Sequence, residues 1–221
     1  MITATVLSLC LLKTPGASAK DVFMQTMEHY AKLDSFSTDI EHDFSSGLFA
    51  GKYKQHLDFK KGKGFKLVVI PSKESDGKDK IAPDFYCDGV DVTTVGRFDG
   101  TKPINKDANS MPAYEVSGGL IMTWLLDSPS KGLFTKPPAG MKVDIGWGKR
   151  ISWHNEKVDE ITVKMTAGEQ TPLVSFFLDP EHKRLVGNEW IANGKVGFMI
   201  YRSQKANPAV NPSIFKPPVT E

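Results

Sequence analysis

Short runs of alternating apolar and polar residues, separated by turns of only a few residues, restrict most strongly how this chain can fold. Ile161, Val163 and Met165 alternate with polar residues, and similar runs recur between residues 141 and 202. Asn193-Gly194 separates two of these runs, and this dipeptide is typical of a two-residue β-hairpin. Strands joined by hairpin-length turns pair antiparallel with their sequence neighbours. The second half of the chain is therefore predicted to form an antiparallel meander.

The first half carries the same signature. Residues 52–60 alternate cleanly, with a glycine-rich turn at 61–64 after them, and residues 84–96 predict two short strands about Asp88-Gly89. Residues 101–112 predict a polar loop. The sequence shows no βαβ rhythm and no internal repeat. We therefore expect an α+β fold built on a large curved antiparallel sheet, or half-open β-barrel, of about eleven strands.

Two segments have helical periodicity instead. Residues 20–33 place apolar side chains at helical spacing, with Asp21 as the expected N-cap. Within residues 117–134 a second apolar stripe is formed by Leu120, Ile121, Trp124 and Leu125. An antiparallel sheet commonly exposes one face and buries the other, so helices are needed to cover the buried face. The second helix could close the mouth of a half-open barrel as a lid, or it could be ordinary core.

The N-terminal residues resemble an export signal. The apolar run at residues 6–12 is followed by a breaker and then by Ala17-Ser18-Ala19, which fits a secretory cleavage site. The first five residues lack the usual positive charge, and a buried N-terminal strand is the alternative. A lipoprotein signal needs a small residue just before the cysteine that receives the lipid, and Leu9 is too large for that position. We therefore expect no lipid anchor on Cys10. We therefore expect residues 1–19 to be a signal peptide, residues 20–221 a single domain, and the mature protein periplasmic or secreted.

The charge pattern excludes one class of partner. The 28 basic and 26 acidic residues are scattered along the chain and give a net charge of +2. Nucleic-acid-binding domains instead concentrate lysine and arginine on one face. We therefore expect no nucleic-acid partner.

Sequence motifs for catalysis or cofactor binding are absent. The sequence contains no GxSxG, HExxH, CxxC or Walker A pattern. Its five histidines are dispersed, and only His42 and His56 could meet across neighbouring strands. The alternating carboxylates of Asp39, Glu41 and Asp43 are expected to face solvent, and Cys87 to be a small buried residue. We expect a protein that is not an enzyme and that has no catalytic residues, no metal and no cofactor.

Three short pieces resemble the LolA-like family of periplasmic lipoprotein carriers, and also predicted periplasmic proteins believed to share that fold. Residues 22–36 resemble the family's first helix running into a strand, residues 83–89 a short strand ending in Asp-Gly, and residues 215–218 its closing Phe-x-Pro-Pro. The resemblance implies an open barrel, lined with apolar side chains and lidded by helices, that holds acyl chains. The carriers have an arginine on an early strand that holds the lid closed. The matching position here is Lys66, and a lysine cannot make the same forked pair of hydrogen bonds to backbone carbonyls.

Two functions follow as hypotheses. The first is an exported carrier or sensor of acyl-chain lipid or lipoprotein, monomeric, with a possible protein partner at the membrane surface. The second is a structural or interaction module with a filled core, favoured because residues 173–178 and 196–201 are apolar on both faces, so that the outer face would be covered by the chain's tail or a partner. The predicted ligand-binding residues are Phe23, Met27, Leu57, Phe65, Leu67, Leu120, Trp124, Leu125 and Trp153.

Overall fold

The structure is a computed structural model that describes residues 16–45, 51–70, 84–89, 91–95, 105–107, 137, 139–167, 172–182, 184–192 and 194–216. In these residues one α-helix precedes a series of strands, and a short 3-10 helix follows them. The elements are α1 (Ala19–Ala31), β1 (Ser35–Phe44), β2 (Gly51–Lys60), β3 (Gly64–Ile70), β4 (Asp84–Cys87), β5 (Asp91–Val95), β6 (Asn105–Asp107), β7 (Met141–Trp147), β8 (Ser152–Trp153), β9 (Glu156–Lys157), β10 (Asp159–Ala167), β11 (Leu173–Leu178), β12 (Leu185–Ala192), β13 (Lys195–Ala206) and η1 (Pro212–Phe215).

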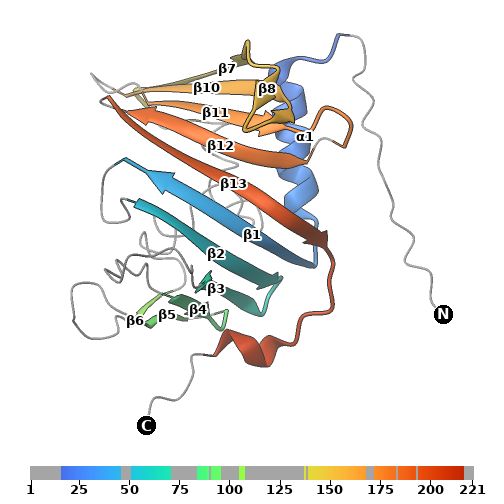
Figure 1. The fold of residues 1–221 in the computed structure, drawn as a ribbon, viewed down its shortest axis with the longest axis vertical. Helices are drawn as coiled ribbons and strands as arrows, with labels where there is room; N and C mark the ends of the chain where they lie inside the picture. Colours follow the sequence, from blue (N-terminus) through green and yellow to red (C-terminus); the bar gives the residue numbers. More distant parts are fainter. Residues whose placement is uncertain are drawn as a thin grey trace, which may run out of the picture.

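The strands other than β8 and β9 form one antiparallel sheet of eleven strands, in the order β6-β5-β4-β3-β2-β1-β13-β12-β11-β10-β7 (Figure 1). Two meanders meet at its centre, where β1 pairs with β13 from the far end of the chain. The large, open antiparallel sheet expected from the sequence is thereby confirmed. The polar loop expected at residues 101–112 is wrong in part, because β6 pairs through its backbone with β5.

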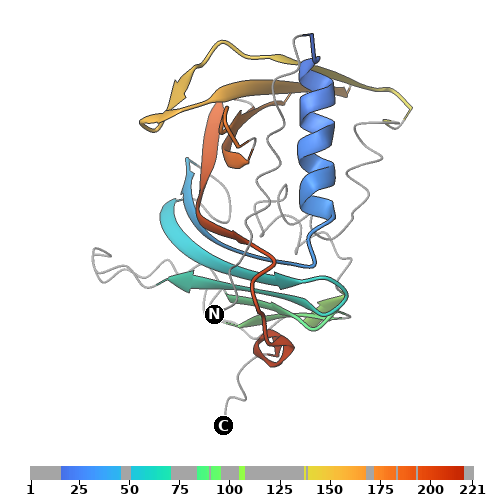
Figure 2. The same ribbon diagram turned by 90° about the vertical axis from the view of Figure 1, so that its right-hand side faces the viewer.

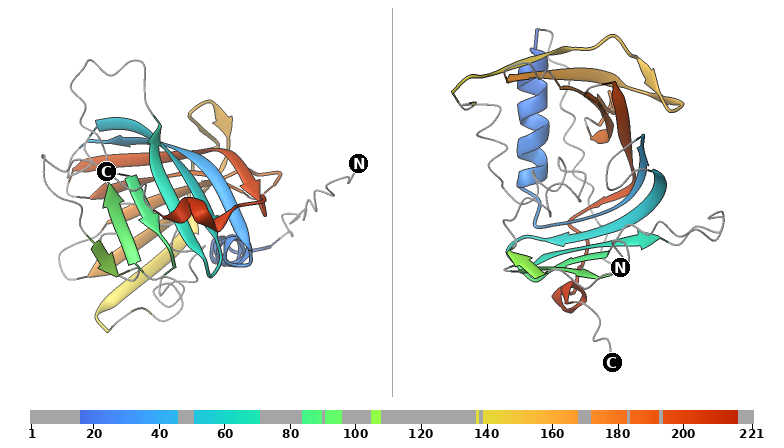
Figure 3. Two further views of the ribbon diagram at one scale, coloured as in Figure 1. Left: turned by 90° about the horizontal axis from the view of Figure 1, so that it is seen from below. Right: turned by 90° about the vertical axis from the view of Figure 1, so that its left-hand side faces the viewer.

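The sheet is strongly curved, and α1 lies against its concave side (Figures 2 and 3). The helix runs from β7, against which it packs, toward β1 and β2. The buried side of the helix presents Val22, Phe23, Met27 and Tyr30, which recur at the spacing of a helical stripe. In β1, Ile40 and His42 face the helix side, whereas Asp39 and Glu41 face the convex side.

The helix begins at a different cap from the one expected. Ser18, not Asp21, is the N-cap: the Asp21 N–H donates to Ser18 Oγ (3.1 Å), and the Ser18 N–H donates to the Asp21 carboxylate (3.3 Å). Such a capping box satisfies two otherwise unpaired groups at the helix start. Ala17, just before it, packs against the buried cluster. Cleavage after Ala19 would remove this cap, at a cost of about 1 kcal/mol to helix stability.

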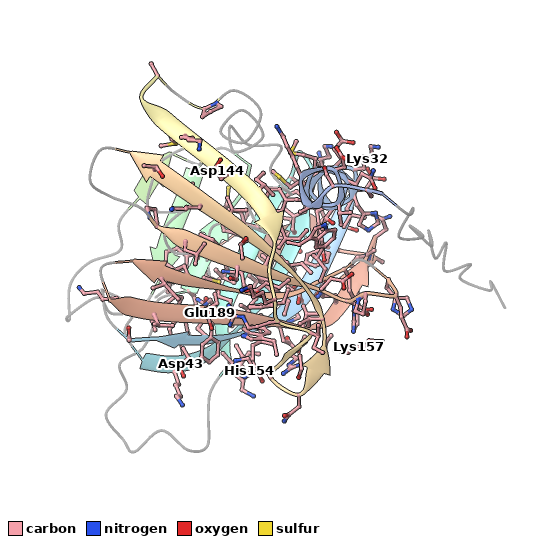
Figure 4. The ribbon with its side chains drawn as sticks, turned by 90° about the horizontal axis from the view of Figure 1, so that it is seen from above. Lys32, Asp43, Asp144, His154, Lys157 and Glu189 are labelled. Atoms are coloured by element: carbon pink, nitrogen blue, oxygen red, sulfur yellow. The ribbon has the colours of Figure 1, made fainter. Side chains whose placement is uncertain are left out.

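Part of the convex face is covered by the chain's own β8–β9 hairpin. The tail also contacts the sheet, because η1 packs against β3 and its Phe215 is buried. His154 and Asn155 form the two-residue turn of the hairpin, both with positive φ, as a type I′ turn requires. The hairpin carries Trp153 onto the sheet, where its ring stacks on Phe177 at 4.1 Å between centroids. Figure 4 shows His154 on the side of the sheet opposite Lys32, which ends α1. The convex cluster consists of Trp153, Val158, Phe177, Val186 and Ile200, with Phe198 against it.

A glycine makes room for this hairpin. A Cβ added at Gly187 would lie 2.4 Å from the Trp153 ring and 2.4 Å from the Met199 carbonyl oxygen. Since one of these neighbours is backbone, the clash cannot be relieved by turning a side chain alone. Trp153 can therefore pack on the sheet only because Gly187 of β12 has no side chain.

Gly187→Ala is expected to lower the free energy of unfolding by about 1–3 kcal/mol, because it overpacks the contact with Trp153. Gly146→Ala is the matched control, since its Cβ would meet only the Thr162 hydroxyl at 3.9 Å. That control should change stability by less than about 0.5 kcal/mol or raise it slightly. Urea unfolding followed by tryptophan fluorescence measures both, and equal midpoints for the two variants would contradict the packing described.

Candidate functional site

The concave side of the sheet, together with α1, forms the candidate site. Its apolar side chains make one continuous group, here called the concave cluster, that draws on the helix and on both meanders. Five of the nine predicted ligand-binding residues belong to it, each at most 3% exposed: Phe23, Met27, Leu57, Phe65 and Leu67. The cluster also contains Tyr30, Phe36, Ile40, Phe44, Phe59, Phe85, Cys87, Ile161, Val163, Phe176 and Met199. The strand alternation thus gathers large apolar side chains on the side covered by the helix.

The helix is attached to the sheet by apolar contacts along its length and by polar ones at its end. The Phe23 ring lies 4.9 Å from that of Phe176, and the Tyr30 ring lies edge-on to Phe36 at 5.5 Å. The Tyr30 hydroxyl donates to the Gln204 side chain (2.7 Å) and accepts from the Leu185 N–H (3.0 Å). Tyr30 therefore ties the end of α1 to both β12 and β13.

Of the other four predicted ligand-binding residues, one lies on the opposite face and three lie outside the described residues. Trp153 is 6% exposed but belongs to the convex cluster, so the prediction that it lines the apolar site is corrected. Its hairpin folds over the outer face, whereas the sequence pattern treated it as another strand of the sheet. Leu120, Trp124 and Leu125 lie outside the described residues, as does the rest of the expected lid helix.

Four buried polar side chains come from the concave side of the central strands. Thr38 donates to the Arg202 carbonyl (2.7 Å), and Asn188 accepts from the Tyr201 hydroxyl (2.7 Å). His42 and Gln55 make no side-chain hydrogen bond. Burial lowers the pKa of His42 to about 3, so its ring is neutral at physiological pH. Among residues with a described side chain, the one buried carboxylate is Glu160, which binds Arg150 on the convex face.

The convex face is charged along β1 and β2. Acidic residues of β1 lie opposite basic residues of β2, in the pairs Asp43–Lys52 (3.3 Å), Glu41–Lys54 (2.8 Å) and Asp39–His56 (2.6 Å). The expectation that these carboxylates face outward is confirmed. His42 and His56, by contrast, project from opposite faces, so the two histidines that could have met across neighbouring strands do not meet.

His56 also lies beside a serine. Its Nε2 is 3.4 Å from Ser37 Oγ, and its Nδ1 is 2.6 Å from the Asp39 carboxylate. Hydrogen bonding to Asp58, and then to Asp39, raises the pKa of His56 to about 9. A protonated imidazole has no lone pair to accept the serine proton, so this Ser-His-Asp arrangement lacks the general base that nucleophilic catalysis needs.

Lys66 does not face the helix. It alternates with Phe65 and Leu67, so its ammonium projects from the convex side, 5.9 Å from the centroid of the Tyr86 ring. A side chain there cannot reach a lid on the concave side. The position that resembles the carriers' arginine therefore has no lid-holding role through this lysine.

Two kinds of feature are absent from the described residues. No group of three or more histidine, cysteine, aspartate or glutamate residues is arranged to hold a metal ion in that part of the chain. None of its helices is both long and apolar enough to cross a membrane.

Solved structures share this fold at low sequence identity. The lipoprotein LppX of Mycobacterium tuberculosis matches with a TM-score of 0.52 and 13% identity over 87% of this chain and 97% of that one. An uncharacterized conserved protein of Thermus thermophilus matches with a TM-score of 0.51 and 5% identity over 89% and 93%. A LolA superfamily protein of Nitrosomonas europaea matches with a TM-score of 0.38 and 11% identity over 91% and 98%.

At such identities the likeness shows the fold alone. It shows that this chain shares the fold of LppX and of the Thermus thermophilus protein. No protein-family model matches the sequence. No curated protein sequence matches it either.

The two histidines predict a stability maximum near pH 6.5. His42 has a depressed folded-state pKa, so its stabilising effect is present above pH 6.5 and is lost as the pH falls toward 3. His56 has a raised pKa, so its contribution is complete below pH 6.5 and is lost as the pH rises through 9. Between about pH 4.5 and 5.5, where His42 is neutral in the folded chain and protonated in the unfolded chain, it should give a slope of about 1.4 kcal/mol per pH unit.

Urea unfolding of the wild type, His42→Phe and His56→Gln at several pH values measures these effects. His42→Phe should flatten the acid side of the profile, and His56→Gln the alkaline side. Each variant serves as the control for the other, because the two residues lie on opposite faces. An acid side that keeps its slope in His42→Phe would show that the His42 ring is not buried in the neutral form.

Proposed function

We propose that this chain is an exported protein that binds the acyl chains of lipids between α1 and the concave face of its sheet, as a carrier or sensor. The observation that carries the proposal is the composition of the concave cluster. Its apolar side chains form one group beneath a single helix, and the buried polar residues beside them are uncharged. An acyl chain is the ligand class such a surface favours, because its binding depends on removing apolar area from water.

The fold supports the same proposal. This chain shares its fold with LppX, which is a lipoprotein. The joining of the two meanders into one sheet places both halves of the chain around the same concave surface. Lipidic ligands and an exported location suit such a protein, and the expected signal at residues 1–19 agrees with them. No catalytic role is proposed.

The energetics allow reversible binding. Burying one methylene contributes about 0.8 kcal/mol, so a chain of about fourteen carbons gives a gross gain near 11 kcal/mol. The loss of translational freedom and the ordering of the chain offset a large part of this gain. An affinity of about micromolar is the result. A carrier needs such an affinity, because it must also release its ligand.

A second function remains in competition, that of an interaction module with a filled core and no ligand. The observation that favours it is tight packing: Phe23, Phe65 and Phe176 are each 1% exposed. For such a module, burial of the concave cluster serves stability alone. The two functions differ in whether lipid binds.

Lipid should accompany the protein when it is purified from membrane-containing cells without detergent. Solvent extraction followed by mass spectrometry is expected to release acyl lipid in near-stoichiometric amount. Added C14–C18 fatty acid should then shift the tryptophan fluorescence of the delipidated protein. A lipid-free extract together with unchanged fluorescence would favour the interaction module.

The expected lid helix gives a second prediction. If residues 120–126 cover the acyl chain, Trp124→Ala should weaken retention of fatty acid more than it lowers stability. If Trp124 is ordinary core, the same change should cost about 3–5 kcal/mol of folding stability and leave affinity unchanged. Thermal melts with and without fatty acid separate these outcomes. Val186→Ala is the control, because Val186 is buried in the convex cluster, away from the proposed site, and its loss should lower stability and leave fatty-acid affinity unchanged.

A further inference from the structure

Two polar side chains are buried in the concave side without hydrogen-bond partners. His42 of β1 is 3% exposed and Gln55 of β2 is 1% exposed. Both ring nitrogens of His42 and both polar atoms of the Gln55 amide lack a partner. Buried polar groups in proteins are almost always paired, and each unpaired one carries a desolvation cost. Two such residues side by side therefore call for a physical explanation.

The strand register makes them neighbours. In the β1–β2 ladder His42 pairs with Tyr53 and Ile40 with Gln55, so His42 and Gln55 lie on a diagonal of the same face. Gln55 lies close enough to raise the pKa of His42, against the larger lowering by burial. No hydrogen bond of normal geometry joins the two side chains. Their four polar atoms consequently belong to one small region of the concave side.

The surroundings of this pair are apolar and aromatic. The His42 ring stacks on Tyr53 with centroids 4.5 Å apart and lies 5.5 Å from the Phe44 ring. Phe44 in turn contacts Trp190 at 4.7 Å. A Cβ at Gly197 would lie 2.7 Å from Trp190 and 2.8 Å from Phe44, so the absence of a side chain there allows the two rings to meet. Stacking fixes the plane of the imidazole without using its nitrogens.

The hydrogen-bonding capacity of the pair points to one kind of partner. A neutral imidazole offers one N–H donor and one acceptor nitrogen, and a glutamine amide offers two donors and an acceptor oxygen. A hydroxyl group both donates and accepts, so it can bond to the two side chains together. A carboxylate or phosphate only accepts and would also bring a charge, for which a neutral histidine and an amide supply no counter-charge.

We propose that His42 and Gln55 form the polar end of the lipid site and bind an uncharged hydroxyl group, so that the ligand class is a neutral, hydroxyl-bearing acyl lipid. This inference rests on the proposed function and adds the head group to it. The apolar cluster holds the chain, and the unpaired histidine and glutamine select the head. The pair then gains in the complex the hydrogen bonds that both residues lack without ligand.

Four probes with the same eighteen-carbon skeleton test the proposal on the full, delipidated chain: oleyl alcohol, methyl oleate, sodium oleate and octadecene. The wild type is expected to bind oleyl alcohol roughly tenfold more tightly than octadecene, the effect of about one well-made hydrogen bond in a buried site. Oleate should bind more weakly than the alcohol at pH 8, where its carboxylate is ionised. Tryptophan fluorescence reports binding, since Trp190 is two aromatic contacts away from His42.

His42→Phe and Gln55→Met remove the polar atoms while nearly keeping the shapes of the side chains. Each is expected to abolish the roughly tenfold preference for the alcohol and to leave octadecene binding unchanged. Each should also raise the melting temperature of the ligand-free protein, because an unpaired buried polar residue is gone. His56→Phe, on the convex face, is the matched control and should keep the preference. The two variants are independent, so either one carries the test if the other does not fold.

Three outcomes would overturn the proposal in distinguishable ways. If both variants bind all four probes as the wild type does, the pair takes no part in binding. If the variants melt at lower temperature and the preference persists, the two residues are paired internally in solution through water. If the wild type binds none of the four probes, the proposed function fails together with the head-group site. An imidazole ¹⁵N shift of His42 on addition of oleyl alcohol, absent with octadecene, would support direct contact.

Discussion

Strands that are apolar on both faces set the constraint on which this structure depends. In β11 the neighbouring residues Phe176 and Phe177 project to opposite sides of the sheet, and both are at most 1% exposed. A sheet with such strands needs cover on both faces, because either face left bare would expose large aromatic rings to water. The chain provides α1 for the concave side, and the β8–β9 hairpin covers the convex side over β11, β12 and β13. Gly187 admits the hairpin, and the curvature of the sheet accommodates the helix.

The two covers differ in how they are held. The convex hairpin has both a ring stack and ionic contacts, since Arg150 beside it binds Glu160 and Glu189 and lies over the Phe177 ring at 4.6 Å. The helix makes its polar contacts near its end, through the Tyr30 hydroxyl and through the Ala31 carbonyl, which accepts from Lys61. Nearer the N-terminus of the helix, Phe23 packs on Phe176 by apolar contact. Apolar contact is not directional, so an acyl chain can replace part of it without breaking a hydrogen bond.

Much of the sheet could be predicted from the sequence, because a period of two reports directly which residues share a face. The run at residues 173–178, singled out as apolar on both faces, has the bounds of β11, and the predicted two-residue turn at 193–194 separates β12 from β13. Trp153 was misplaced because strands of two residues carry no period, so nothing local says which face they cover. His42 was missed although a signal existed. It shares its phase with Ile40 and Phe44, opposite the charged Asp39 and Glu41, which already placed it inside.

The central claim is that lipid binds on the concave side of this sheet. Photo-crosslinking with a fatty acid that carries a diazirine near its methyl end, followed by peptide mapping, tests it most directly. The account predicts labels on peptides that contain α1, β2 and β3, whose residues Met27, Leu57 and Leu67 belong to the concave cluster. Labels confined to the convex hairpin around Trp153, or spread evenly over exposed residues, would contradict it.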